Sequence, residues 1–203
     1  MATTVSPQRA RILDAVTRVV ADRGYESATV ADVVRAAGVS RTTFYEQFSS
    51  KEACFLAAYA EACDALDERI GAAVRAADGA GWRAQLRAGI RAYLDRLVTD
   101  TALARTFLHE VHAAGPAALS FRDEALRRFS GRYHATYEQA RAVDPTLREP
   151  PPDALYVLCA GTEQLAAARL RTGGPDALPA LEDVFCACAE ALLLHHEPES
   201  EEP

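Results

Sequence analysis

The sequence predicts an all-α fold of about nine helices, and three observations support this prediction. Alanine and leucine, which favour helices, dominate the apolar half of the 203 residues. Apolar residues recur at spacings of three and four, and capping and breaking residues mark the expected helix ends. No segment alternates apolar and polar residues, so no strand is expected.

Three helices are expected in the first 50 residues. A Ser or Thr stands at each start, where its side chain can accept a backbone N–H bond, and a glycine follows the first two helices. The expected helices run from Pro7 to Gly24, from Thr29 to Gly38 and from Arg41 to about Gln47, with N-caps at Ser6, Thr29 and Ser40.

Six further helices are expected in the remainder of the chain. Polar caps, Gly-Pro pairs and a proline-rich connector at 144–152 separate them. The expected ranges are about 51–77, 82–98, 100–114, 116–143, 153–171 and 176–195.

The second and third helices form a helix-turn-helix pattern around Gly38, where the turn requires a positive φ. Phe44 and Phe48 are four residues apart, so they share the face that docks inward. The outward positions are left to Arg41, Thr42, Thr43, Tyr45 and Gln47. Arg, Thr and Gln side chains can bind base edges, and a Tyr hydroxyl can donate to a phosphate. This face therefore predicts contact with DNA.

Two charged residues near this pattern have separate interpretations. Lys51 lies in the first turn of the following helix, where it and the free N–H groups can hold a phosphate. Glu46 either accepts a bond from a cytosine amine or points to solvent. The net charge of −7 argues against a generally basic surface, but the first 50 residues are close to charge balance.

The stretch from Gly24 to Phe55 resembles the N-terminal domain of the TetR family of bacterial transcriptional regulators. The resemblance rests on Ala37-Gly38-Val39-Ser40, Thr43-Phe44-Tyr45 and Ser50-Lys51-Glu52. It implies a homodimer that binds a palindromic operator in double-stranded DNA, usually as a repressor released by a small-molecule effector. It also implies that Thr29, Thr43, Tyr45 and Lys51 meet the DNA backbone. The full set of expected DNA contacts is Thr29, Ser40, Arg41, Thr42, Thr43, Tyr45, Gln47 and Lys51.

We expect three regions along the chain. Residues 1–50 form the helix-turn-helix DNA-binding domain, and residues 51–196 form a larger helical domain for effector binding and dimerisation. Residues 197–203 are acidic and rich in proline, so they are expected to be a disordered tail.

Aromatic and polar side chains in the middle helices are candidates for an effector pocket, which requires an apolar lining with a few polar groups. The alternative is that each of them belongs to the ordinary core. The candidates are Tyr59, Cys63, Leu66, Trp82, Tyr93, Phe107, His109, Val111, His112, Phe121, Phe129, Tyr133 and Tyr137.

The last two helices are apolar around much of their circumference, so they are expected to bury more than one side. One side packs on the chain's own core, and a second copy of the chain can cover the other. A core within one chain is the alternative. The expected dimer contacts are Leu155, Leu158, Cys159, Leu165, Leu181, Val184, Phe185, Cys188 and Leu192.

Other classes of protein are less well supported. His109, Glu110 and His112 could serve a helical metal-dependent enzyme, but no HExxH motif, nucleophile–base pair or phosphate-binding loop accompanies them. No enzyme activity, cofactor, metal or membrane partner is therefore expected. A constitutive DNA-binding regulator without an effector stays open. The five cysteines form no CxxC pair, and no apolar stretch is long enough for a membrane span, so we expect a cytoplasmic protein with reduced, buried thiols.

Overall fold

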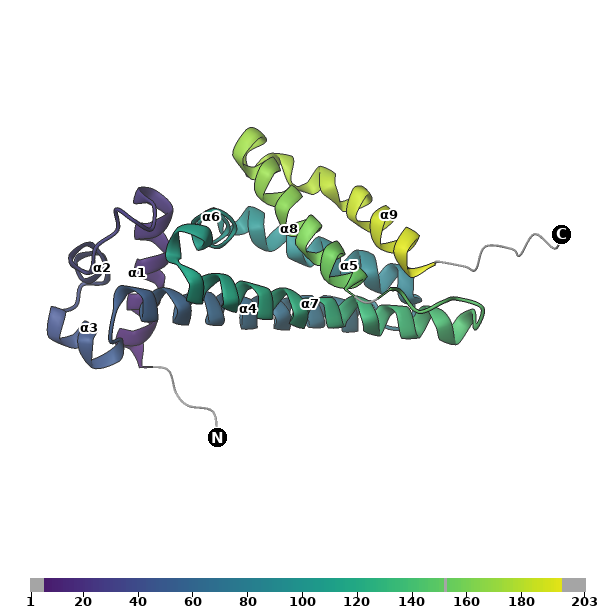
Figure 1. Cartoon of the computed structure of the whole chain (residues 1–203), viewed down its shortest axis with the longest axis horizontal. Helices are drawn as coiled ribbons and strands as arrows, with labels where there is room; N and C mark the ends of the chain where they lie inside the picture. The colour runs from purple at the N-terminus through teal and green to yellow at the C-terminus, as the bar shows by residue number, and fades with distance from the viewer. Residues whose placement is uncertain (1–5, 152, 195–203) are drawn as a thin grey trace. The chain divides into compact units, whose positions relative to one another are not determined.

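The computed structural model describes residues 6–151 and 153–194, and within these ranges it is helical without any strand (Figure 1). The all-α prediction is confirmed. The expected tail at 197–203 lies outside the described residues. The helices are α1 (Pro7–Arg23), α2 (Val30–Ala37), α3 (Arg41–Gln47), α4 (Lys51–Ala76), α5 (Trp82–Thr99), α6 (Thr101–His109), α7 (Pro116–Val143), α8 (Ala154–Gly173) and α9 (Glu182–Leu193), with 3-10 helices η1 (Glu110–Ala114), η2 (Pro175–Ala177) and η3 (Pro179–Leu181). None of the described helices combines the length and apolar character needed to cross a membrane.

Two of the three named N-caps form. The side chains of Thr29 and Ser40 each accept a bond from the backbone N–H three residues later, at 3.2 and 3.0 Å. Asp100, at the start of the range expected over 100–114, caps its helix in the same way at 3.0 Å. The prediction for Ser6 is wrong, because its side chain makes no capping bond and only its carbonyl enters the helix. Pro7 occupies the first helical position, where its fixed φ already directs the chain into α1.

Two predicted helices are shorter than expected, and a 3-10 segment takes up the difference. The helix expected over 100–114 ends at His109 and continues as η1. The last helix begins only at Glu182, after η2 and η3. Pro175 and Pro179 open these two turns, and a proline without an N–H cannot continue an α-helical ladder.

The chain divides into two compact units. Unit 1 comprises the residues up to Ala65 together with Asp100–Arg122, and unit 2 comprises Leu66–Thr99 together with the residues from Asp123 onward. Segments that are distant in the sequence therefore share one core in each unit. The assignment of DNA binding to residues 1–50, and of effector binding and dimerisation to residues 51–196, stays a prediction.

Unit 1 holds α1, α2, α3, the beginning of α4, and α6 with η1 (Figure 1). Its core contains the fully buried side chains of Ile12, Val33, Phe44 and Phe55. Helix α1 packs against both α2 and α6. Thr106 on α6 is a buried polar residue, and its hydroxyl donates to the Thr17 carbonyl of α1 at 2.8 Å. This bond satisfies the hydroxyl and ties α6 to α1.

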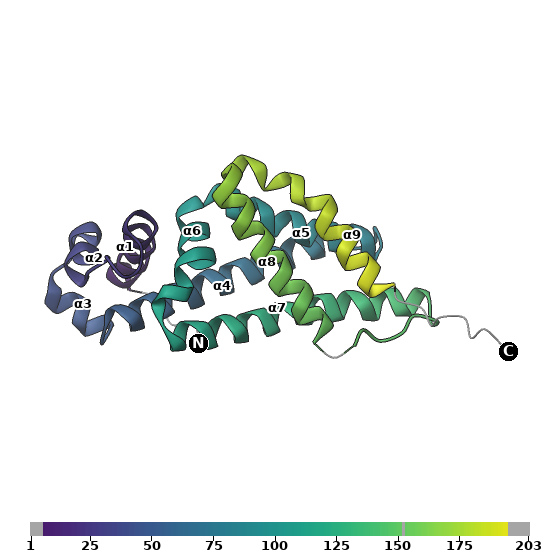
Figure 2. The ribbon, with the colours of Figure 1, turned by 45° about the horizontal axis from the view of Figure 1, so that its top comes forward.

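Unit 2 holds α5, α8, α9 and most of α7, with α5 packed against α9 and α8 beside α9 (Figure 2). Its largest fully buried side chains are Leu94, Tyr137, Leu178, Leu181 and Leu193. Arginines of α5 pair with the first turn of α9: Arg87 and Arg91 reach Glu182 at 2.9 and 2.7 Å. These arginines hold the pKa of Glu182 at about 2. Because both arginines are largely exposed, the pairs align the helices more than they stabilise them.

The cysteines follow the prediction with one exception. All five are free thiols, and Cys54, Cys63, Cys159 and Cys186 are buried. Burial raises the pKa of the Cys54 and Cys159 thiols to about 12, so both stay protonated and unreactive. Cys188 is exposed on α9, which corrects the expectation of a buried side chain.

Candidate nucleic-acid interface

Helix α3 is fixed in place by its N-cap and by two phenylalanines. Ser40 caps the helix, and its hydroxyl also lies 2.9 Å from the Thr43 hydroxyl. Phe44 and Phe48 are buried with ring centroids 5.8 Å apart, so the predicted inward face is confirmed. The turn before α3 has Gly38 at φ 63° and ψ 40°, a left-handed conformation that glycine adopts without steric cost. These local contacts determine which face of α3 is left outward.

The outward face of α3 carries most of the predicted DNA contacts. Arg41, Thr42 and Tyr45 are exposed, and Tyr45 keeps 50% of its surface accessible although its ring edge contacts Phe44. Thr43 and Gln47 are half-buried at the flanks. Glu46 is exposed on the same helix. A guanidinium, a hydroxyl and a phenol on one exposed helix face can bind base edges and phosphates.

Thr29 lies at the start of α2, where its polar groups are engaged within the chain. Its hydroxyl donates to Asp32 at 2.6 Å, and the Asp32 carboxylate also accepts the Thr29 backbone N–H at 3.2 Å. The bond from Thr29 is the main reason that the pKa of Asp32 is lowered, with Arg23 and Arg35 adding to the effect. Together these bonds form a reciprocal capping box around the predicted N-cap, Thr29. The main role of the Thr29 hydroxyl in the structure is therefore to cap α2.

Lys51 also lies differently from its predicted role. Its ammonium donates to the carbonyls of Tyr25 and Ala28 at 2.6 and 2.9 Å, and sits 4.1 Å from the centroid of the Tyr25 ring. Desolvation in this position lowers the pKa of Lys51. The side chain thus folds back on the α1–α2 loop, and a phosphate contact by Lys51 stays a prediction.

Sequence reasoning missed the contribution of η1 to this unit. The Tyr25 backbone N–H donates to the Glu110 carboxylate at 2.8 Å, across 85 positions of the chain. Glu110 had a sequence interpretation only as a possible member of a metal site with His109 and His112. No local pattern signals the contact, because Tyr25 lies in the loop between α1 and α2 and Glu110 lies in η1. Within the described residues, no group of three or more His, Cys, Asp or Glu side chains could hold a metal ion.

The candidates for the effector pocket divide between the two units. In unit 1, Tyr59 stacks on Phe107 with centroids 4.7 Å apart and also contacts Phe121 at 5.1 Å. Val111 and Cys63 are buried, His109 is half-buried and His112 is exposed. The candidates in unit 2 are the buried Trp82 and Tyr137 and the half-buried Leu66, Tyr93, Phe129 and Tyr133.

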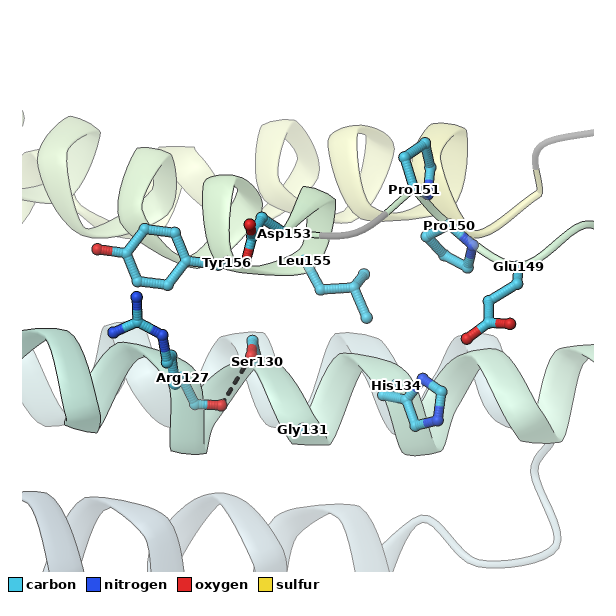
Figure 3. A pocket seen from close by; sticks show the side chains of 10 residues that line it. All are labelled: Arg127, Ser130, Gly131, His134, Glu149, Pro150, Pro151, Asp153, Leu155 and Tyr156. Atoms are coloured by element: carbon cyan, nitrogen blue, oxygen red, sulfur yellow. Dashed lines mark hydrogen bonds between the residues drawn. The ribbon is translucent and has the colours of Figure 1, made fainter.

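Unit 2 contains a groove of about 330 Å³ that none of these candidates lines. Figure 3 shows it between α7 and the segment that leads into α8, with Leu155 pointing toward α7. The Arg127 guanidinium lies 5.1 Å from the centre of the Tyr156 ring, whose hydroxyl donates to Asp123 at 3.1 Å. Leu155, expected at a dimer contact, lines this groove and is half-buried, so its dimer contact stays a prediction. The lining residues are Arg127, Ser130, Gly131, His134, Glu149, Pro150, Pro151, Asp153, Leu155 and Tyr156.

The expected dimer contacts fall into three groups by their exposure. Cys159, Leu181 and Phe185 are buried in the core of unit 2, so they are not available to a partner, which corrects the prediction. Leu158 and Leu192 are half-buried. The exposed apolar positions are Leu165 and Cys188, Val184 with 45% of its surface accessible, and Val157 with 65%. Val157 was not predicted, although its spacing of eight from Leu165 places both on one face of α8.

The known proteins that this chain is similar to are bacterial transcriptional regulators. A family model described as bacterial regulatory proteins of the tetR family matches residues 12–58. A transcriptional activator, FasR of Mycolicibacterium smegmatis, is 33% identical over 94 residues, which span 46% of this chain and 42% of that protein. The match therefore covers less than half of the activator's length.

Solved structures share the fold over nearly the whole chain. The fatty acid degradation regulator FadR from Bacillus halodurans has a TM-score of 0.76 at 20% identity, covering 96% of this chain and 100% of that one. The regulator FadR from Bacillus subtilis, solved in complex with stearoyl-CoA, has the same TM-score and identity, covering 93% of this chain and 99% of that one. A tetR-family regulator from Shewanella sp. PV-4 has a TM-score of 0.70 at 19% identity, covering 93% of this chain and 97% of that one.

Proposed function

We propose that the chain, whose residues 12–58 match the family model of bacterial regulatory proteins of the tetR family, is a homodimeric repressor that binds a palindromic operator. In this proposal a small-molecule effector releases it from the DNA. It acts in the cytoplasm as a regulator rather than as an enzyme.

The outward face of α3 carries this proposal. Arg41, Thr42 and Tyr45 are exposed on a helix whose opposite side is anchored by buried phenylalanines. In a helix-turn-helix, the second helix enters the major groove with the residues near its N-terminus against base edges. We assign base contacts to Arg41, Thr42 and Gln47 and backbone contacts to Thr43 and Tyr45. Ser40, Thr29 and Lys51 support these contacts from within the chain.

The exposed apolar face of α8 and α9 supports the homodimer. Val157 and Leu165 on α8, and Val184 and Cys188 on α9, leave apolar surface open to solvent. A two-fold dimer buries the same face of both copies and presents two copies of α3 to adjacent turns of one DNA face. An inverted repeat in the operator follows from that symmetry.

Selection of bound duplexes from randomised DNA tests the DNA-binding part. The wild-type chain is expected to enrich an inverted repeat with half-sites about 34 Å, or 10 base pairs, apart. Tyr45→Ala removes an exposed side chain, so it is expected to fold normally and to lose most of this enrichment. Enrichment without symmetry would contradict the dimer. Equal enrichment by the variant would contradict the role of Tyr45.

Stearoyl-CoA is the first effector to test, because the Bacillus subtilis regulator of similar fold binds it. With the selected duplex, saturating stearoyl-CoA is expected to weaken DNA binding about 5- to 150-fold, as a coupling of about 1–3 kcal/mol does. Coenzyme A alone is the control for the nucleotide part. Thermal stabilisation by stearoyl-CoA without any change in DNA affinity would instead favour a constitutive regulator. Reporter transcription with and without the protein distinguishes a repressor from an activator such as the Mycolicibacterium relative.

A further inference from the structure

The peptide that joins α1 to α2 is held from both sides by charged side chains. On one side, the Tyr25 N–H donates to Glu110 Oε2 at 2.8 Å. On the other side, Lys51 Nζ donates to the Tyr25 carbonyl at 2.6 Å and to the Ala28 carbonyl at 2.9 Å. Hydrogen bonds to ionised partners are roughly twice as strong as neutral ones. The loop is therefore fixed by two helices that are remote from it in the sequence.

Side-chain packing closes the same loop. The Tyr25 ring is buried beneath the Lys51 ammonium and meets the edge of Phe55 with centroids 5.0 Å apart. Phe55 in turn contacts Phe107 of α6 at 5.6 Å. The ring contacts thus run from the loop to the helix that precedes Glu110. Because these rings are closely packed, a shift of α6 and η1 would displace the loop as well.

Gly24 lies beside the Glu110 carboxylate. A Cβ at this position would lie 3.4 Å from Glu110 Oε2, at ordinary contact distance, and the backbone has φ +78°, which favours glycine. The carboxylate accepts the next N–H in the chain, that of Tyr25. The acceptor itself stands at the first residue of η1, where α6 changes to a 3-10 turn. Such changes of helix type often mark hinges.

The loop determines where α2 begins. Thr29, the N-cap of α2, follows Tyr25 by four residues, and Gly38 then leads directly to α3. A displaced Tyr25 therefore displaces the start of the helix-turn-helix. The bond from Thr106 to the Thr17 carbonyl gives α6 a second attachment on the same side of the unit.

We infer that Glu110 is a positioning residue for DNA binding, whose carboxylate holds the α1–α2 loop so that α3 meets the operator correctly. Movement of η1 that breaks the bond to Tyr25 lowers operator affinity without unfolding the unit. This inference rests on the proposed DNA-binding function. It assigns to η1 a regulatory contact on the helix-turn-helix.

Three variants of the full chain test the inference. Glu110→Ala removes the acceptor, Glu110→Gln keeps an acceptor oxygen without the charge, and Glu61→Ala removes an exposed acid on α4 in the same unit. Affinity for the selected duplex is measured by fluorescence anisotropy, well below each melting temperature. Amide exchange at Tyr25 is measured on the same samples without DNA.

Glu110→Ala is expected to weaken duplex binding about tenfold and to speed exchange of the Tyr25 amide at least about tenfold, since a part-buried N–H loses its partner. Glu110→Gln is expected to lie between this variant and the wild type. Glu61→Ala is expected to stay within about twofold of the wild type in both measurements, as surface substitutions do.

Each other result overturns the inference. Faster Tyr25 exchange with unchanged duplex affinity would mean that the loop does not position α3. Unchanged exchange would mean that Glu110 does not hold the loop. An equal loss in Glu61→Ala would identify a general effect of negative charge near DNA. A wild-type chain that binds no duplex would refute the proposed function itself, whatever the exchange data show.

Discussion

Replacing Phe44 with alanine is expected to lower the free energy of unfolding of unit 1 by about 3–5 kcal/mol. Phe44 is 0% exposed and contacts the rings of Tyr45 and Phe48, with centroids 5.3 and 5.8 Å away. Its removal leaves a cavity beneath α3, and the short helix has no other buried side chain along its length. The loss is a large part of the stability of an ordinary domain.

Hydrogen exchange in α1 and α3 measures this change in unit 1. In a denaturant titration of the same variant, the fluorescence of Trp82, the only tryptophan of the chain, reports the unfolding of unit 2. Tyr45→Ala is the matched control, because the neighbouring aromatic side chain is half exposed. It is expected to cost less than about 1 kcal/mol. A wild-type exchange pattern in Phe44→Ala would show that Phe44 does not anchor α3.

Val184→Asp is expected to convert the proposed dimer to a monomer. Val184 lies on the exposed apolar face of α9, and in a two-fold dimer both copies would bring a carboxylate into the interface. A buried charge without a partner costs about 3–5 kcal/mol, so the dimer Kd is expected to rise at least about a hundredfold. The operator affinity falls with it, since a monomer binds one half-site.

Sedimentation velocity at micromolar concentration distinguishes the two states. Val143→Asp is the control, because it places the same charge on a valine that is 77% exposed, at the end of α7. This variant is expected to stay dimeric. A dimeric Val184→Asp protein would place the interface elsewhere than on α9. A monomeric wild-type chain would refute the proposed dimer.

The helix-turn-helix could be predicted because its determinants are local. The caps at Thr29 and Ser40 act on residues three positions away, and Gly38 needs only its own backbone conformation. Phe44 and Phe48 face inward because a spacing of four places them on one side of a helix. Periodicity and capping rules contain all of this information.

The partners of charged residues could not be predicted in the same way. Lys51 was expected to hold a phosphate, and in the structure it binds two carbonyls that lie 23 and 26 positions earlier. Glu110 reaches back 85 positions. Sequence spacing carries no information on such pairs, because they depend on how the helices pack. The apolar pattern of the last expected helix had a similar limit: it predicted dimer contacts for Leu181 and Val184 alike, but the core of unit 2 buries Leu181 and leaves Val184 exposed.

Unit 1 is built from two separate segments of the chain, and this affects how domains could be exchanged between related regulators. A chimaera joined after residue 50 would transfer α1 to α3 without the buried Thr106 bond, the Phe107 ring or the Glu110 acceptor. The transplanted helices would then pack against the other regulator's residues at these three positions. A graft that also carries residues 100–122 keeps all three native contacts. If α3 binds an operator as proposed, we therefore expect its preference to be transferred faithfully only when both stretches of sequence are exchanged together.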